Sequence, residues 1–332
     1  MASGKILRQL IKTGSHGDVI AFKQVSEAVI REERQKQHHL LANDLEKILY
    51  GNSERQGAVL HQFSERIPSD QERGLPLLFV KTSGRNLDEV VLSKENRDGL
   101  EDILEQHHRG DVLKSYGLRP SDKILFCGPP GCGKTLTAEV LATELERPLA
   151  TIRMDSVVSS YLGETAANLR KVFDFIDSSP MVALFDEFDA LGKEREDSTD
   201  HGELKRVVNS VLQMLDGYQG KSLIIAATNH EQMLDSAIWR RFEEVFFFNL
   251  PTRDELLQLL QIKLRGVRCD FEVSDDQILS IFAKMTHAEV EKIIRRAIKE
   301  MVLKGQEFLQ IRLITKAVQR EQAQSKHASR RK

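Results

Sequence analysis

Short apolar runs alternate with helix-like stretches between about residue 77 and residue 250. Five such runs are KILFCG, LATIRMD, MVALFD, LIIAAT and VFFFNL, and each ends in or just before a polar or small residue. Continuous apolar strands separated by helical segments are typical of a parallel sheet with helices on both faces. Ligands bind such sheets at the carboxyl ends of the strands, so the residues that end each run are the candidates for a site.

Helical patterns precede and follow this α/β region. Apolar positions recur on one face of a helical pattern within residues 1–50. After Pro251 the strands stop and further helical segments follow. Three of these segments start with a sequence that fits a capping box, at Thr252–Glu255, Ser274–Gln277 and Thr286–Glu289.

The patterns therefore predict five segments along the chain. They are a helical N-terminal region (1–50), a linker (51–83), a large α/β domain (84–251), a small helical lid domain (252–322) and a basic tail (323–332). The tail is read as a solvated, disordered terminus.

Composition narrows the classes of protein to consider. The 332 residues are 40% apolar and 30% charged with a formal net charge of −2, which gives no general electrostatic reason to expect nucleic acid or an anionic membrane as partner. No apolar run is long enough for a membrane span or a signal peptide. The three cysteines form neither a disulfide framework nor a metal-site spacing, so we expect a cytoplasmic protein in a reducing compartment.

The strand KILFC leads into GPPGCGKT, residues 128–135, and then into a helix from about Leu136. This is the G-x-x-x-x-G-K-T loop in its strand–loop–helix context, where backbone N–H groups and the helix N-terminus face phosphates. Lys134 is expected to reach the β- and γ-phosphates, and the Thr135 hydroxyl to bind Mg²⁺. The predicted nucleotide-binding residues are Gly128, Pro129, Pro130, Gly131, Cys132, Gly133, Lys134, Thr135 and Leu136.

Two further strand ends carry polar side chains. MVALF is followed by Asp186 and Glu187, which suit an Mg²⁺ ligand and a base or positioner for the attacking water. The alternative is a pair of solvated acids. LIIAAT is followed by Asn229, which either contacts the attacking water or the γ-phosphate, or simply starts a turn.

Arg240 and Arg241 are adjacent and precede the last apolar strand. An arginine supplied by a neighbouring subunit can stabilise the charge of a phosphoryl-transfer transition state. From the residues alone, an arginine finger and a solvated basic pair are equally supported.

The ordered motifs GPPGCGKT, ALFDEFDALGKER, VLQMLDGY, IIAATN and LDSAIWRRF resemble the AAA family of ring-forming ATPases over roughly residues 84–320. The likeness is to a single module of the protein-remodelling type, similar to katanin and spastin and to proteasomal and membrane-protease ATPases. It implies ATP and Mg²⁺, a hexamer with a central pore, arginine fingers at Arg240 and Arg241, and an intersubunit signalling motif at Asp216 and Gly217. Two positions depart from the family: His287 replaces a glycine, and Lys263 replaces an adenine-side histidine.

The stretch SSYLGET stands where the family carries an aromatic–aliphatic–glycine triplet on a loop that faces the pore. By this resemblance Tyr161 and Leu162 grip a polypeptide and Gly163 allows the loop to turn. A large, rigid ring packs against many side chains, which suits a motor that pulls unlike sequences. The alternative is a tyrosine packed within its own loop.

The residues and the resemblance together favour an ATP-driven unfoldase or disassembler that acts as a homo-oligomer on polypeptide substrates. The first 75 residues resemble the helical N-terminal regions of stand-alone bacterial AAA proteins, which dock clients or adaptors. No H-E-x-x-H or G-x-S-x-G is present, so degradation would need a separate protease. A second hypothesis is an ATP-gated assembly switch that activates a partner enzyme without threading. A nucleic-acid motor is disfavoured by the near-neutral charge.

Overall fold

The computed structural model describes residues 25–26, 28–29, 67–70, 74–157, 162–191, 201–234 and 236–329. The chain divides into two compact units, residues 1–65 and 66–332. The described residues of the first unit are helical. The rest of the predicted helical region 1–50, and residues 51–66 of the predicted linker, lie outside the described residues.

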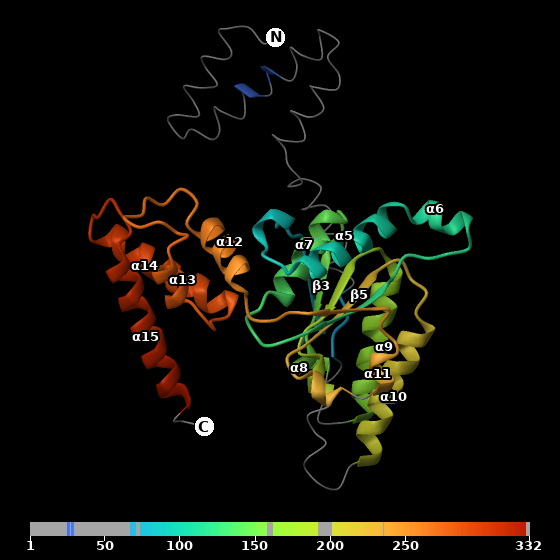
Figure 1. Cartoon of the computed structure of the whole chain (residues 1–332). Helices are drawn as coiled ribbons and strands as arrows, with labels where there is room; N and C mark the ends of the chain where they lie inside the picture. The colour runs from blue at the N-terminus through green and yellow to red at the C-terminus, as the bar shows by residue number, and fades with distance from the viewer. Residues whose placement is uncertain are drawn as a thin grey trace. The chain divides into compact units, whose positions relative to one another are not determined.

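The second unit is built on a mixed sheet (Figure 1). In the described part of the chain the sheet has six strands in the order β1-β3-β4-β5-β2-β6. All neighbouring strands run parallel except β1, which pairs antiparallel with β3. The strands are β1 (Leu78–Lys81), β2 (Lys123–Cys127), β3 (Leu149–Ile152), β4 (Val182–Phe185), β5 (Leu223–Thr228) and β6 (Glu244–Phe247). The predicted α/β fold is confirmed.

Strand β1 is the element that the periodicity did not indicate. It lies within the range 51–83 that was predicted as a linker, and the proposed boundary at residue 83 stays a prediction. Leu78 is fully buried and pairs with Ile152, whereas Phe79 is half exposed and lies 5.3 Å from the guanidinium of Arg153. Strand β1 begins two residues after Pro76, at the end of a polar stretch with Pro and Gly that is typical of a linker.

Helices cover both faces of the sheet (Figure 1). On one face α5 (Lys94–His108) and α7 (Lys134–Glu144) pack on alternate strand residues such as Phe126, whose ring meets those of two other phenylalanines at 4.9 and 5.8 Å. On the other face lie α9 (Leu162–Ser178) and α10 (His201–Gly217), with Phe173 of α9 against Phe185 of β4. Full burial of one such ring contributes about 1.5–3 kcal/mol.

The remaining elements of this region are short. They are the helices α6 (Gly110–Ser115), α8 (Met154–Val157) and α11 (Ser236–Trp239), and 3₁₀ turns at Leu87–Glu89, Phe188–Leu191 and Glu231–Met233. Among the described residues, no helix is both long enough and apolar enough to cross a membrane.

Four helices follow the sheet, and they share a separate apolar core (Figure 1). They are α12 (Arg253–Lys263), α13 (Asp276–Ile281), α14 (His287–Leu303) and α15 (Ile311–Ser329). Fully buried residues from three of these helices, Leu260, Ile278 and Ile314, belong to this core. The split of the chain at residues 251–252 and the boundary at residue 323 stay predictions. The prediction of a disordered tail is wrong for residues 323–329, which are the end of α15.

The predicted capping boxes form at two of the three positions. Thr252 and Glu255 exchange side-chain–backbone hydrogen bonds of 2.8 and 3.4 Å, and Thr286 and Glu289 do the same. The third prediction, Ser274–Gln277, is wrong by one residue. Helix α13 is capped by Asp275, whose carboxylate accepts a 2.9 Å hydrogen bond from the backbone N–H of Gln277. Asp and Ser are about equally common at the N-cap of a helix, so the local sequence alone did not show which of Ser274 and Asp275 is the cap.

The shifted cap gives a test with adjacent variants. Replacing Asp275 by Ala leaves the first turn of α13 without its acceptor, so we expect the free energy of unfolding to fall by about 1 kcal/mol. Ser274→Ala removes an exposed hydroxyl next to it and should change stability by less than about 0.5 kcal/mol. Urea unfolding of both variants measures the difference, and a larger loss in Ser274→Ala would contradict the observed cap.

Candidate nucleotide-binding site

The loop between β2 and α7 turns back on itself through its glycines. Gly128, Gly131 and Gly133 have φ angles of 140°, 79° and 102°, a region that side chains disfavour. At Gly128 a Cβ atom would lie 2.1 Å from the carbonyl oxygen of Phe248, so the neighbouring strand end excludes any larger residue. Helix α7 begins directly after the loop at Lys134, and its N-terminal N–H groups therefore face the loop's concave side.

Lys134 ties this loop to the sheet. Its side chain is 6% exposed, and its ammonium donates to the carbonyl oxygens of Gly128 at 2.6 Å and Pro129 at 3.0 Å and to Oδ1 of Asn229 at 2.8 Å. Burial lowers the pKa of Lys134 below its usual value. An ammonium has three donors, and neutral oxygens accept all three. Phosphate oxygens are charged acceptors and form stronger hydrogen bonds, so a phosphate can take over these donors.

Thr135 and Asp186 meet at the mouth of the loop. The Thr135 hydroxyl donates to one carboxylate oxygen of Asp186 at 2.9 Å, and the other oxygen accepts from the backbone N–H of Glu187 at 2.9 Å. Hydroxyl and carboxylate oxygens are ligands that Mg²⁺ prefers, so this pair of side chains fits the ion chemically.

Glu187 is exposed and holds an unusual backbone conformation. Its φ of 53° is in the left-handed region, where a non-glycine residue costs of the order of 1–3 kcal/mol. Strain of this kind collects at functional sites because the surrounding structure must hold it in place. Here the turn after β4 brings Glu187 to the cavity described below, next to Asp186.

Asn229 is positioned by a residue to which sequence analysis assigned no role. Asp189 is fully buried, and its Oδ1 accepts hydrogen bonds from the Thr228 hydroxyl at 3.2 Å and the Asn229 N–H at 3.4 Å. The signal available in the sequence was a third acid in the motif DEFDALGKER. Its partner could not be inferred, because the two segments are 40 residues apart.

The predicted residues surround one cavity of about 360 Å³. Its lining from the loop and the strand ends is Pro130, Gly131, Gly133, Lys134, Thr135, Leu136, Asp186, Glu187 and Asn229. Gly128 and Pro129 contribute their carbonyl oxygens to Lys134 instead, and Cys132 is buried behind the loop, where burial raises the pKa of its thiol.

Helices α12 and α14, together with the segment 89–91 before α5, supply the rest of the lining of this cavity. The Ala288 N–H donates to the carbonyl oxygen of Gly131 at 3.0 Å, which joins the start of α14 to the loop. Lys263 forms a 2.6 Å ion pair with Glu291, and His287 lies beside them with its pKa lowered by burial. The loop-to-α14 contact was missing from the sequence analysis.

The remaining predicted residues lie outside this cavity. Arg241 forms ion-paired hydrogen bonds with Asp216 at 3.0 to 3.3 Å, and its Nη1 donates to the Ala237 carbonyl oxygen. Arg240 is exposed, and its side chain makes no hydrogen bond or ion pair with the residues that the structure describes. Gly217 ends α10, next to Asp216.

The predicted pore triplet is described only in part. Tyr161 lies outside the described residues, and Leu162 and Gly163 are the first residues of α9. Their roles stay predictions.

Comparisons with known proteins agree with the fold. A model of the family described as "ATPase family associated with various cellular activities (AAA)" matches residues 124–250. A protein of Sinorhizobium fredii described as "Uncharacterized AAA family ATPase y4kL" is 38% identical over 321 residues, which cover 97% of this chain and 96% of that protein. This chain belongs to the AAA family and is an ATP-binding ATPase.

Proposed function

We propose that this ATPase hydrolyses ATP at a site completed by an arginine from a neighbouring subunit, and that a homo-hexameric ring uses the energy to unfold, thread or disassemble protein substrates. The proposal is carried by the positions of the charged groups, which lie in two separate places. The residues proposed to bind phosphate and metal line one cavity, whereas Arg240 is exposed elsewhere and Arg241 is held by Asp216.

The groups of the cavity have distinct roles in this mechanism. Lys134 and the loop N–H groups bind the β- and γ-phosphates and orient the terminal phosphorus for in-line attack. Thr135 and Asp186 would hold Mg²⁺, which when bound neutralises charge on the phosphate oxygens. Glu187 takes a proton from the attacking water, and Asn229 orients that water or the γ-phosphate. The products are ADP and phosphate.

In this proposal the arginines supply a cation for the charge that develops in the transition state. Transfer of the γ-phosphoryl group spreads negative charge over its oxygens, and in the proposed ring Arg240 of the next subunit approaches that charge. In this account Arg241 acts differently from a mobile finger. Its two-point contact with Asp216 fixes the segment 236–241 to the end of α10, and so couples the arginines to the proposed intersubunit motif Asp216–Gly217.

The unfolding part of the proposal rests on the sequence triplet Tyr161–Leu162–Gly163 and on the resemblance that gives it a place in the pore. An ATP-gated assembly switch that recruits a partner enzyme, such as a separate protease or an adaptor, is the second candidate. Both place the protein in the cytoplasm, with the N-terminal region 1–50 as the docking element, and neither involves nucleic acid.

Mixed rings test whether Arg240 acts on a neighbour. Arg240→Ala alone should lower kcat by about 10³-fold or more, because the transition-state charge loses its cation. Lys134→Ala subunits cannot bind nucleotide productively but still carry Arg240. Mixing the two inactive variants should restore part of the phosphate release, since each Lys134→Ala subunit offers its arginine to an intact site.

The matched control for this mixture is Arg265→Ala, which removes an exposed arginine at the end of the α12 region. Subunits with this change should hydrolyse ATP normally, alone or mixed. Mass measurement shows whether the rings contain both Arg240→Ala and Lys134→Ala subunits. If such mixed rings are inactive, Arg240 does not act on a neighbouring subunit.

The threading proposal is tested with a substrate trap. Glu187→Gln should bind ATP, hydrolyse it slowly and retain clients, which mass spectrometry identifies after capture from cells. Clients held by this variant should be lost when Tyr161→Ala is added, and kept when the control Tyr116→Ala is added, since Tyr116 is exposed on α6's C-terminal end. Tyr161→Ala alone should still release phosphate from ATP. Identical partners in all three traps would favour the assembly switch.

A further inference from the structure

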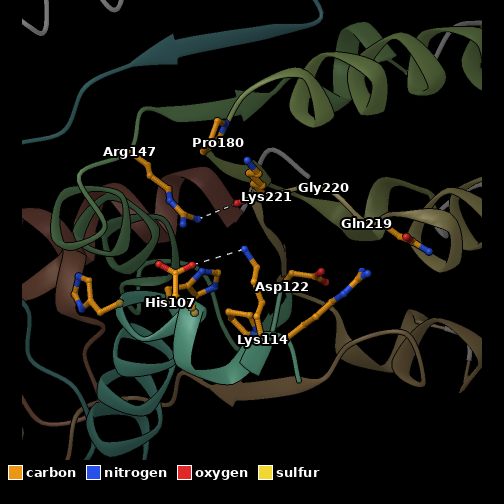
Figure 2. Close-up of a pocket in the computed structure, with 13 residues that line it drawn as sticks. His107, Lys114, Asp122, Arg147, Pro180, Gln219, Gly220 and Lys221 are labelled. Carbon is orange, nitrogen blue, oxygen red and sulfur yellow. Dashed lines mark hydrogen bonds and ion pairs between the residues drawn. The ribbon is translucent and has the colours of Figure 1, made fainter. Parts of the chain in front are cut away.

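A second cavity, of about 370 Å³, lies at the other ends of the parallel strands from the nucleotide cavity. Figure 2 shows the residues that line it. Its walls come from the end of α5, from α6 and from the segments that lead into β2, β3, β4 and β5. These four strands run parallel, so the cavity sits at their amino ends, whereas the loop and the strand-end residues of the nucleotide cavity follow their carboxyl ends.

The lining of this cavity carries an excess of cations. Four side chains are positively charged at neutral pH, and they are Lys114, Arg119, Arg147 and Lys221. Two carboxylates also line it. Asp122 is already paired with Lys123 at 2.9 Å, and exposed Asp111 lies 3.9 Å from Lys114. These two carboxylates do not neutralise all four cations of the lining.

Arg147 distinguishes this cavity from an ordinary basic surface. It is partly buried, and burial lowers its pKa. Its Nη1 donates to the carbonyl oxygen of Lys221 at 3.0 Å, but it forms no ion pair with any carboxylate that the structure describes. A buried charge without a counter-ion is costly, whereas exposed cations such as Arg119 are stable in water. An anion in the cavity would offset this cost.

The arrangement of the cations indicates the kind of anion. In Figure 2 the side chains of Arg147 and Lys114 extend toward the same space from different elements. A guanidinium presents five N–H donors in a planar fork, and only one of these donors of Arg147 makes a hydrogen bond with the residues that the structure describes. Such a fork matches two oxygens of a phosphate or carboxylate, and further cations around it favour a ligand with more than one negative charge.

We propose that this cavity binds a phosphate-bearing small molecule, with Arg147 contacting the phosphate oxygens and Lys114, Arg119 and Lys221 neutralising its charge. A volume near 370 Å³ is in the range of small-ligand sites. The site is separate from the nucleotide loop, so one chain binds two phosphate ligands at opposite ends of the same strands.

Titration with inorganic pyrophosphate tests this site, at constant ionic strength and in full-length Lys134→Ala protein, in which the nucleotide loop is impaired. Calorimetry should show saturable binding in this parent. Adding Arg147→Gln should weaken the affinity by about tenfold or more, because a charge-assisted hydrogen bond is lost. The pair Arg119→Gln/Lys221→Gln, on exposed residues, should weaken it as well without affecting folding.

The control is Arg265→Gln/Arg312→Gln in the same parent, which removes the same charge from exposed positions outside the cavity. It should leave the affinity unchanged, and circular dichroism confirms that each variant is folded. Absence of saturable binding in the parent, or equal weakening by the control pair, would overturn the proposal. A third outcome is that pyrophosphate fails to bind, whereas a ten-residue polyglutamate peptide binds the parent and not Arg147→Gln. That outcome would replace the proposed phosphate site with an acidic-peptide site.

Discussion

The ammonium of Lys134 is the contact on which the nucleotide site depends. It joins two carbonyl oxygens of its own loop to the amide of Asn229, and these acceptors come together because β5 is the direct neighbour of β2 in the sheet. A buried ammonium surrounded by neutral acceptors is stable only while all three of its N–H donors make hydrogen bonds. A phosphate that takes over these donors therefore also releases Asn229.

That release gives the site a physical route to other parts of the molecule. Asn229 is fixed to buried Asp189 through its backbone, so its side chain can turn while β5 stays in place. On the other wall, Gly131 accepts a hydrogen bond from Ala288 at the start of α14, which links the proposed phosphate-binding loop to the four-helix region. In the proposed ring, changes in the phosphates would reach a neighbour through these contacts and through the arginine segment held by Asp216.

The sequence predicted the parts of the fold that depend on local pattern. Each of the five apolar runs overlaps a strand, and the loop and strand-end residues that line the cavity were predicted from motif and periodicity. What was missed depends on contacts between distant segments. The β1 pairing with β3, the Asp189 bonds to β5, and the Ala288 bond to the loop each join residues with no local signal. The Asp275 cap was missed for a different reason, because two adjacent residues suit the same position.

The central claim is that one chain builds the nucleotide cavity and a neighbour completes it. An electron cryomicroscopy structure of Glu187→Gln with ATP and Mg²⁺ tests this most directly. The account predicts that Lys134 has turned from the carbonyl oxygens of Gly128 and Pro129 to the phosphates, and that Arg240 of an adjacent subunit lies within hydrogen-bond distance of the γ-phosphate. A bound nucleotide that no neighbouring subunit contacts, or an Arg240 that reaches the γ-phosphate of its own chain, would contradict it.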